Sequence, residues 1–321
     1  MIDPDSVPAA GDPPEFHADF LELSVFKSAE RSVSIHAYIR DLRLSNADEA
    51  AADAVDDIDA ETDDGDDYSE PLAESAFSEL DDRTQACGGS GVDHYPFEIT
   101  ANRVALCDNA ESSLYTFLAL LSWFGKDAGP PGTDGEKLFE EVSAQVAAAY
   151  LGGPNPDVKW FVFGFPRRLT TAKGFKDALD TLCRALGEGQ GHHKGRPKLP
   201  DEKDAKLDVV AWREFSDRRQ GKLINFGQCA TGRNWAGKVT ELPQTVDWCT
   251  TWMADRPGVW PIRSFFVPHR IDAANWFDTC VKGGLLYDRC RIASLTARLD
   301  GALKGQCEAW SQHVLQRIRT N

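Results

Sequence analysis

The sequence has no run of apolar residues long enough to cross a bilayer. Its longest apolar stretch, residues 114–125, has 12 residues, whereas a membrane-spanning helix needs about 20. The N-terminus is acidic and rich in proline, and it lacks the basic and apolar regions of a signal peptide. These absences predict a cytoplasmic protein with no membrane partner.

Several motifs of common enzyme and metal-site classes are also absent. The chain has eight cysteines but no Cys-x-x-Cys pair, so a disulfide framework or a structural zinc site is not favoured. We expect free thiols in a reducing compartment instead. Neither the GxSxG motif of hydrolases nor the GxxxxGK[ST] loop of nucleotide triphosphatases occurs, so those two functions lose their usual support.

The net charge of −16 is unevenly distributed along the chain. Residues 1–100 contain 26 acidic and 5 basic residues, whereas residues 101–321 contain 25 acidic and 30 basic residues. The front third is either a solubilising surface or a region that contacts a partner. The remainder is mildly basic and is able to approach a phosphate backbone.

The order of apolar patterns divides the chain near residue 130, where glycine and proline precede a Thr-Asp pair that can start a helix. We predict an acidic, mainly helical accessory domain over residues 1–130, with a flexible segment near residues 46–72. A second domain with a C-terminal helical extension is expected over residues 131–321. In the first part, the patterns predict two helices within residues 19–43, a helix over 72–85, a hairpin over 95–107 and a buried helix over 113–124.

From residue 134 onward, helical and strand patterns alternate, which predicts a mixed α/β domain. The polar residues 216–220 are too few for a parallel crossover, so the two strands that flank them should be antiparallel neighbours. The expected elements are helices over 136–150, 171–186, 235–242 and 295–318, and strands over 160–165, 207–212, 223–229 and 264–267.

Three polar residues stand in otherwise apolar surroundings. Glu140 lies on the helix 136–150, Asp208 near the start of a strand, and Gln228 at the end of the next strand. Carboxylates from a helix and a strand that meet at one strand end form an oxygen-rich pocket suited to Mg²⁺ or Mn²⁺. Alternatively, Glu140 is a solvated carboxylate in competition with Glu141, Asp208 flanks a turn, and Gln228 bonds a neighbouring strand.

Three segments resemble the PD-(D/E)xK nuclease superfamily, in particular its Mrr-like branch. They are LFEEVSAQVAAAYLGG (138–153), KDAKLDVVAW (203–212) and GKLINFGQCATGRNW (221–235), and they cover about a third of the chain. The resemblance implies a restriction-endonuclease-like mixed sheet flanked by helices, with Glu140, Asp208 and Gln228 as metal ligands and catalytic residues. It further implies Mg²⁺-dependent hydrolysis of DNA, with RNA not excluded, and by analogy an effector in anti-phage defence with a partner protein from the same operon.

One position departs from the family pattern. In the family pattern, the catalytic lysine stands two positions after the third ligand. Gln228 is followed by Cys229 and Ala230, so Ala230 occupies the position of the lysine. Lys238 is the first candidate to replace it, and Lys222 and Lys206 are weaker ones. The alternative is a catalytically inactive descendant of the fold that binds nucleic acid or serves as a scaffold.

The C-terminal part mixes aromatic and basic residues, which is typical of nucleic-acid contacts, although surface arginines more often form ion pairs. Asp288 is one carboxylate that can pair with these arginines. The candidates for nucleic-acid binding are Arg233, His269, Arg270, Arg289 and Arg291.

Overall fold

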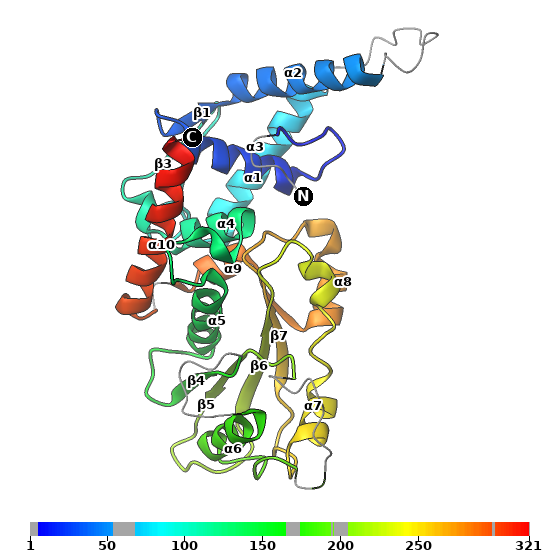
Figure 1. The fold of residues 1–321 in the computed structure, drawn as a ribbon, viewed down its shortest axis with the longest axis vertical. Coiled ribbons are helices and arrows are strands. Elements are labelled where there is room, and N and C mark those ends of the chain that lie inside the picture. Colours follow the sequence, from blue (N-terminus) through cyan, green and yellow to red (C-terminus); the bar gives the residue numbers. More distant parts are fainter. Residues whose placement is uncertain are drawn as a thin grey trace.

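The computed structural model describes residues 6–53, 68–164, 174–193, 195, 205–296 and 299–320. Within these residues the fold is mixed α/β, as predicted, with one three-stranded sheet of order β1-β3-β2 and one five-stranded sheet of order β4-β5-β6-β7-β8. The two sheets lie in different parts of the molecule (Figure 1). No described helix is both long and apolar enough to cross a membrane.

Helices dominate the N-terminal part, and the small sheet lies beside them (Figure 1). The first helix starts earlier than its apolar spacing suggests because Pro14 occupies its first turn, where a missing N–H costs nothing. Of the segment predicted to be flexible, residues 46–53 are helical and residues 54–67 lie outside the described residues. The elements are α1 (Pro14–Lys27), β1 (Ser32–Ser34), α2 (Ile35–Asp53), α3 (Ser69–Ala86), β2 (Phe97–Thr100) and β3 (Arg103–Leu106).

Helix α4 (Leu114–Phe124) forms the centre of this part, as its apolar sequence predicts. The Ser113 hydroxyl caps it by accepting a hydrogen bond from the Tyr115 N–H. Short helices η1 (Ala110–Ser112) and η2 (Lys126–Ala128) flank it. Most of its side chains are buried, which is why the sequence is apolar all around the helix rather than on one face.

The five-stranded sheet combines an antiparallel and a parallel half. Its strands are β4 (Val158–Val162), β5 (Val209–Arg213), β6 (Leu223–Cys229), β7 (Ile262–Phe266) and β8 (Leu285–Tyr287). Strands β4, β5 and β6 are antiparallel neighbours, which confirms the predicted pairing of the two central strands. The pairs β6–β7 and β7–β8 are parallel. Parallel neighbours need a longer connection, and these two connections contain α7 (Thr245–Trp252) and α8 (Ala273–Gly283), respectively.

Helices cover both faces of the sheet, and the alternation of side chains along β5 shows how. Val209 and Ala211 join the core formed with α5 (Gly135–Tyr150), whereas Val210 and Trp212 join the core formed with α6 (Phe175–Leu186) and α7. Both faces of β5 are therefore buried, which explains its nearly continuous apolar sequence.

The C-terminal segment returns to the N-terminal part. Helix α9 (Arg289–Ala293) contacts α4, and α10 (Gly301–Thr320) packs against α1, α4 and α5 (Figure 1). One hydrophobic core therefore includes residues from both sides of the predicted boundary near residue 130. The division of the chain into two domains stays a prediction.

Candidate functional site

Asp208 lies directly before β5, at a point where three strand ends meet. Its carboxylate Oδ2 accepts a hydrogen bond of 2.7 Å from the Cys229 N–H at the end of β6. Its carbonyl accepts bonds of 2.6 and 3.0 Å from the N–H groups of Phe163 and Gly164, just after β4. Because both donors use this one carbonyl, the ladder of hydrogen bonds between β4 and β5 ends there. Strand β4 therefore ends at Val162, three residues before the end of the predicted strand 160–165.

Glu140 reaches the same place from helix α5. Its carboxylate lies against the Cα of Gly164, where an added Cβ would be 2.9 Å from Oε2 and 3.0 Å from Oε1. Gly164, which sequence reasoning did not single out, therefore contacts the side chain of Glu140 and the main chain of Asp208.

The Cys229 thiol completes this cluster. Burial raises its pKa well above the ordinary value, and the carboxylates of Asp208 and Glu140 raise it further. The thiol therefore stays neutral, and Ser143 of α5 lies beside it. A cysteine is a small hydrophobe in most cores, which is why the sequence gives no signal for its position between two carboxylates.

Gln228 does not join the two carboxylates, so its prediction as a third ligand is wrong for this structure. Successive side chains of a strand point to opposite faces, and Cys229 points toward α5. The Gln228 amide lies on the other face, where its oxygen accepts from the Leu242 N–H at 3.0 Å and its nitrogen donates to Glu241 at 3.3 Å.

The three lysines considered as replacements differ in their surroundings. Lys222 lies at the far end of β6, buried, with its ammonium bonded to Glu214 at 2.7 Å and to the Leu186 carbonyl at 2.8 Å. Lys206 forms an ion pair of 3.0 Å with Glu241. Lys238 is half-exposed on η3 (Trp235–Lys238), and its ammonium bonds no described residue.

The donor set fits magnesium in kind but is small. The described residues contain no group of three histidine, cysteine or acidic side chains that could hold a metal. Mg²⁺ is commonly bound by one or two carboxylates, with waters and substrate phosphate as the other ligands. Glu140 and Asp208 supply two such carboxylates: that of Asp208 accepts the bond from the Cys229 N–H, and that of Glu140 packs against Gly164.

Two of the five predicted nucleic-acid contacts are wrong for this structure because their side chains are used internally. Arg289 is completely buried and pairs with Asp19 at 2.8 Å and Glu22 at 3.2 Å. Arg270 pairs with Asp288 at 2.7 Å and Glu79 at 2.9 Å. The alternative, that Asp288 pairs with one of these arginines, is confirmed.

His269, Arg233 and Arg291 occupy different environments. His269 Nε2 donates to the Thr231 carbonyl at 3.2 Å, and burial together with the nearby Arg289 lowers its pKa to about 4, so it is neutral at pH 7. Arg233 and Arg291 are exposed, although each donates to a backbone carbonyl. The Arg291 guanidinium also lies 4.5 Å from the centre of the Trp276 ring.

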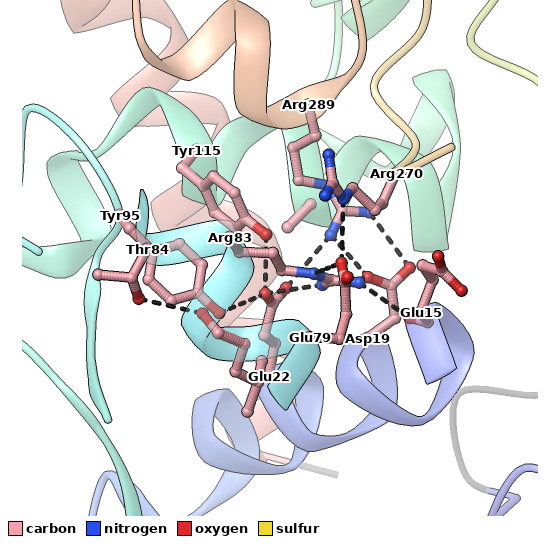
Figure 2. Close-up of polar contacts among 12 residues, drawn as sticks. Glu15, Asp19, Glu22, Glu79, Arg83, Thr84, Tyr95, Tyr115, Arg270 and Arg289 are labelled. Carbon is pink, nitrogen blue, oxygen red and sulfur yellow. Dashed lines mark hydrogen bonds and ion pairs between the residues drawn. The ribbon is translucent and has the colours of Figure 1, made fainter. Parts of the chain in front are cut away.

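A buried network of ion pairs joins α1 to the C-terminal segment (Figure 2). The Glu22 carboxylate accepts bonds of 2.7–2.8 Å from Arg83 and from the hydroxyls of Tyr95 and Tyr115. Asp19 accepts from both Arg83 and Arg289. This network was not predicted, because its members are far apart in the sequence and belong to no local pattern.

Comparisons with protein-family models, curated proteins and solved structures find no match for this chain.

Proposed function

We propose that this chain is a metal-dependent nuclease of the restriction-endonuclease type that hydrolyses phosphodiester bonds of DNA. The observation that carries the proposal is that Glu140 of α5 and Asp208, directly before β5, place their carboxylates near the same thiol, that of Cys229, while Gly164 contacts both residues. The order of elements also agrees with the motif resemblance: a helix with a glutamate, a strand, an aspartate strand and an antiparallel strand, followed by a parallel one.

In this proposal Glu140 and Asp208 bind Mg²⁺ or Mn²⁺. The ion would polarise the phosphodiester and lower the pKa of a bound water. The Cys229 N–H orients Asp208 by bonding one carboxylate oxygen, and the close contact with Gly164 fixes Glu140. Lys238 is the candidate for the missing motif lysine, since Lys222 is buried in its pair with Glu214.

A second candidate function is a catalytically inactive nucleic-acid-binding or scaffold protein. It is favoured by the orientation of Gln228 and by Ala230, which occupies the lysine position and packs with Val239 and Phe265. In that case the acidic front third would contact a partner. A role as an anti-phage effector rests on the resemblance alone, and a plaque assay with the intact operon tests it.

Cleavage assays separate the two functions. Plasmid DNA and labelled single- and double-stranded DNA and RNA are incubated with Mg²⁺ or Mn²⁺, and with EDTA as the metal-free reference. We expect Asp208→Asn and Glu140→Gln to abolish cleavage. Asp217→Asn, which changes an exposed carboxylate on the β5–β6 turn, should cleave like the parent chain.

If no cleavage is detected, calorimetric titration with Mn²⁺ measures whether the chain binds the metal. Binding by the parent chain but not by Asp208→Asn, without cleavage, would support the inactive metal-binding alternative. Cleavage by Asp208→Asn at the parental rate would overturn the nuclease proposal.

A further inference from the structure

A groove lies at the opposite end of the sheet from Asp208. Strand β4 is an outer strand antiparallel to β5, so its start at Val158 lies opposite Arg213, at the end of β5 farthest from Asp208, and its later residues run back toward Asp208. Together with the last turn of α6 and the β5–β6 turn, these strands enclose a cavity of about 850 Å³. That volume falls within the range of about 300–1000 Å³ typical of ligand pockets.

The floor of the groove is aromatic and held in place. Lys159 lies directly opposite Trp212 in the β4–β5 register, and Phe161 lies two residues farther along the same face. The Trp212 indole donates to Glu214 at 2.7 Å, and Lys222 neutralises that carboxylate at 2.7 Å. The Trp212 ring therefore has a fixed position, and the ion pair of Lys222 and Glu214 carries no net charge.

The rim of the groove is basic and includes an exposed aromatic ring. Phe215 is 61% exposed and lines the groove, so its ring is accessible for stacking. Lys159, Arg184 and Arg218 are exposed around it, and among the described residues none of the three forms an ion pair. They outnumber the single exposed lining carboxylate, that of Asp157.

We infer that this groove binds a segment of single-stranded nucleic acid. Unpaired cations attract the phosphate backbone, and aromatic rings stack with bases irrespective of sequence. A duplex keeps its bases stacked on each other, so Phe215 and Phe161 would gain little from it. The local excess of positive charge is notable in a chain whose formal net charge is −16.

This inference does not rest on the proposed nuclease function. The groove shares no residue with the Glu140–Asp208 cluster, and its binding can be measured in EDTA. If the nuclease proposal fails, single-stranded binding in EDTA should persist. If the groove does not bind single strands, cleavage at the Asp208 site can still be tested.

The test is fluorescence anisotropy with labelled oligo(dT), the same length of RNA, and a duplex, in EDTA at about 50 mM salt. We expect both single strands to bind the parent chain and Asp208→Asn equally, and the duplex to bind at least about tenfold more weakly. Phe215→Ala should weaken single-strand binding by roughly 5- to 100-fold. Three phosphate contacts predict a slope of about −2 for log K against log salt, and Arg218→Gln should reduce its magnitude by about 0.7.

The matched control is Arg219→Gln, which removes the neighbouring charge outside the groove. It should bind like the parent chain, and thermal melting should show that the groove variants and the control are folded, since the side chains of Phe215, Arg218 and Arg219 are exposed. Absence of binding, or equal losses in Arg218→Gln and Arg219→Gln, would overturn the inference. So would competition by polyglutamate as effective as that by oligo(dT), because it would indicate a charged surface without base stacking.

Discussion

Asp19 and Arg289 are separated by 270 positions in the sequence and form an ion pair of 2.8 Å in the interior of the molecule. The guanidinium of Arg289 is completely buried, and it also contacts Glu22 and the hydroxyl of Ser122. The start of α9 is therefore held to helix α1 by buried ion pairs (Figure 2).

Removal of the Arg289 side chain should strongly destabilise the fold. Arg289→Ala leaves Asp19 and Glu22 buried with fewer counter-charges, and we expect a loss of about 3–5 kcal/mol in the free energy of unfolding. Arg319→Ala, which breaks a part-exposed pair with Glu111, should cost no more than about 1 kcal/mol. Urea denaturation followed by circular dichroism measures both, and similar losses would contradict the central role of Arg289.

The same network predicts a defined loss of stability in acid. Desolvation by burial tends to raise the Asp19 pKa, but Arg289 and Arg83 outweigh it and lower the pKa from 3.8 to about 2. Because the folded pKa is depressed, the contribution is complete above about pH 4 and is lost as the pH falls toward 2. It amounts to roughly 2 kcal/mol. Between pH 5 and pH 2, the free energy of unfolding obtained from denaturation curves should therefore fall less steeply for Asp19→Asn than for the parent chain.

Gly164 should tolerate no side chain while Glu140 is present. Gly164→Ala places a Cβ about 3 Å from the Glu140 carboxylate, so we expect a loss of about 1–3 kcal/mol and weaker Mn²⁺ binding. Gly301→Ala, where nothing lies within 4 Å of the added Cβ, is the control. Stability should partly return in Gly164→Ala combined with Glu140→Ala, and strictly additive losses would show that the two residues do not interact.

Restoring the motif lysine in place should not create a better nuclease. Ala230 is buried among Val239 and Phe265, so Ala230→Lys would force an ammonium into an apolar cluster and cost at least about 2 kcal/mol. Ala236→Lys, at an exposed position on η3, should leave stability unchanged. Faster cleavage by a stably folded Ala230→Lys would show that the two faces of β6 are assigned incorrectly.

Lys238 can be tested in the same assay. If it supplies the missing cation, Lys238→Ala should slow cleavage by on the order of 100-fold and leave Mn²⁺ binding unchanged. Lys206→Ala serves as the comparison, because its ammonium already pairs with Glu241. Equal rates for Lys238→Ala and the parent chain would remove Lys238 from the proposed site.

The sequence was informative where a local pattern determines structure. The apolar periodicity of α5 and the apolar strands β5 and β6 gave the correct element types and the correct antiparallel pairing. Glu140 and Asp208 were singled out as candidates because each interrupts such a pattern. Gln228 was misplaced because a shift of one residue along a strand reverses the face on which a side chain lies, and the sequence of β6 did not show which of its faces meets α5. Arg289 was misassigned because its partners on α1 are distant in sequence.

The return of α9 and α10 to the N-terminal helices has a consequence for protein synthesis. During translation, α1 and α4 leave the ribosome long before Arg289 and the residues of α10 that complete their core. Until then the nascent chain carries Asp19 and Glu22 without one of their buried counter-charges, and the apolar faces that α10 covers stay open to chaperones. Folding of the first 130 residues is thus coupled to completion of the last 35, and a ribosome stalled between them should hold a chain that is sensitive to protease.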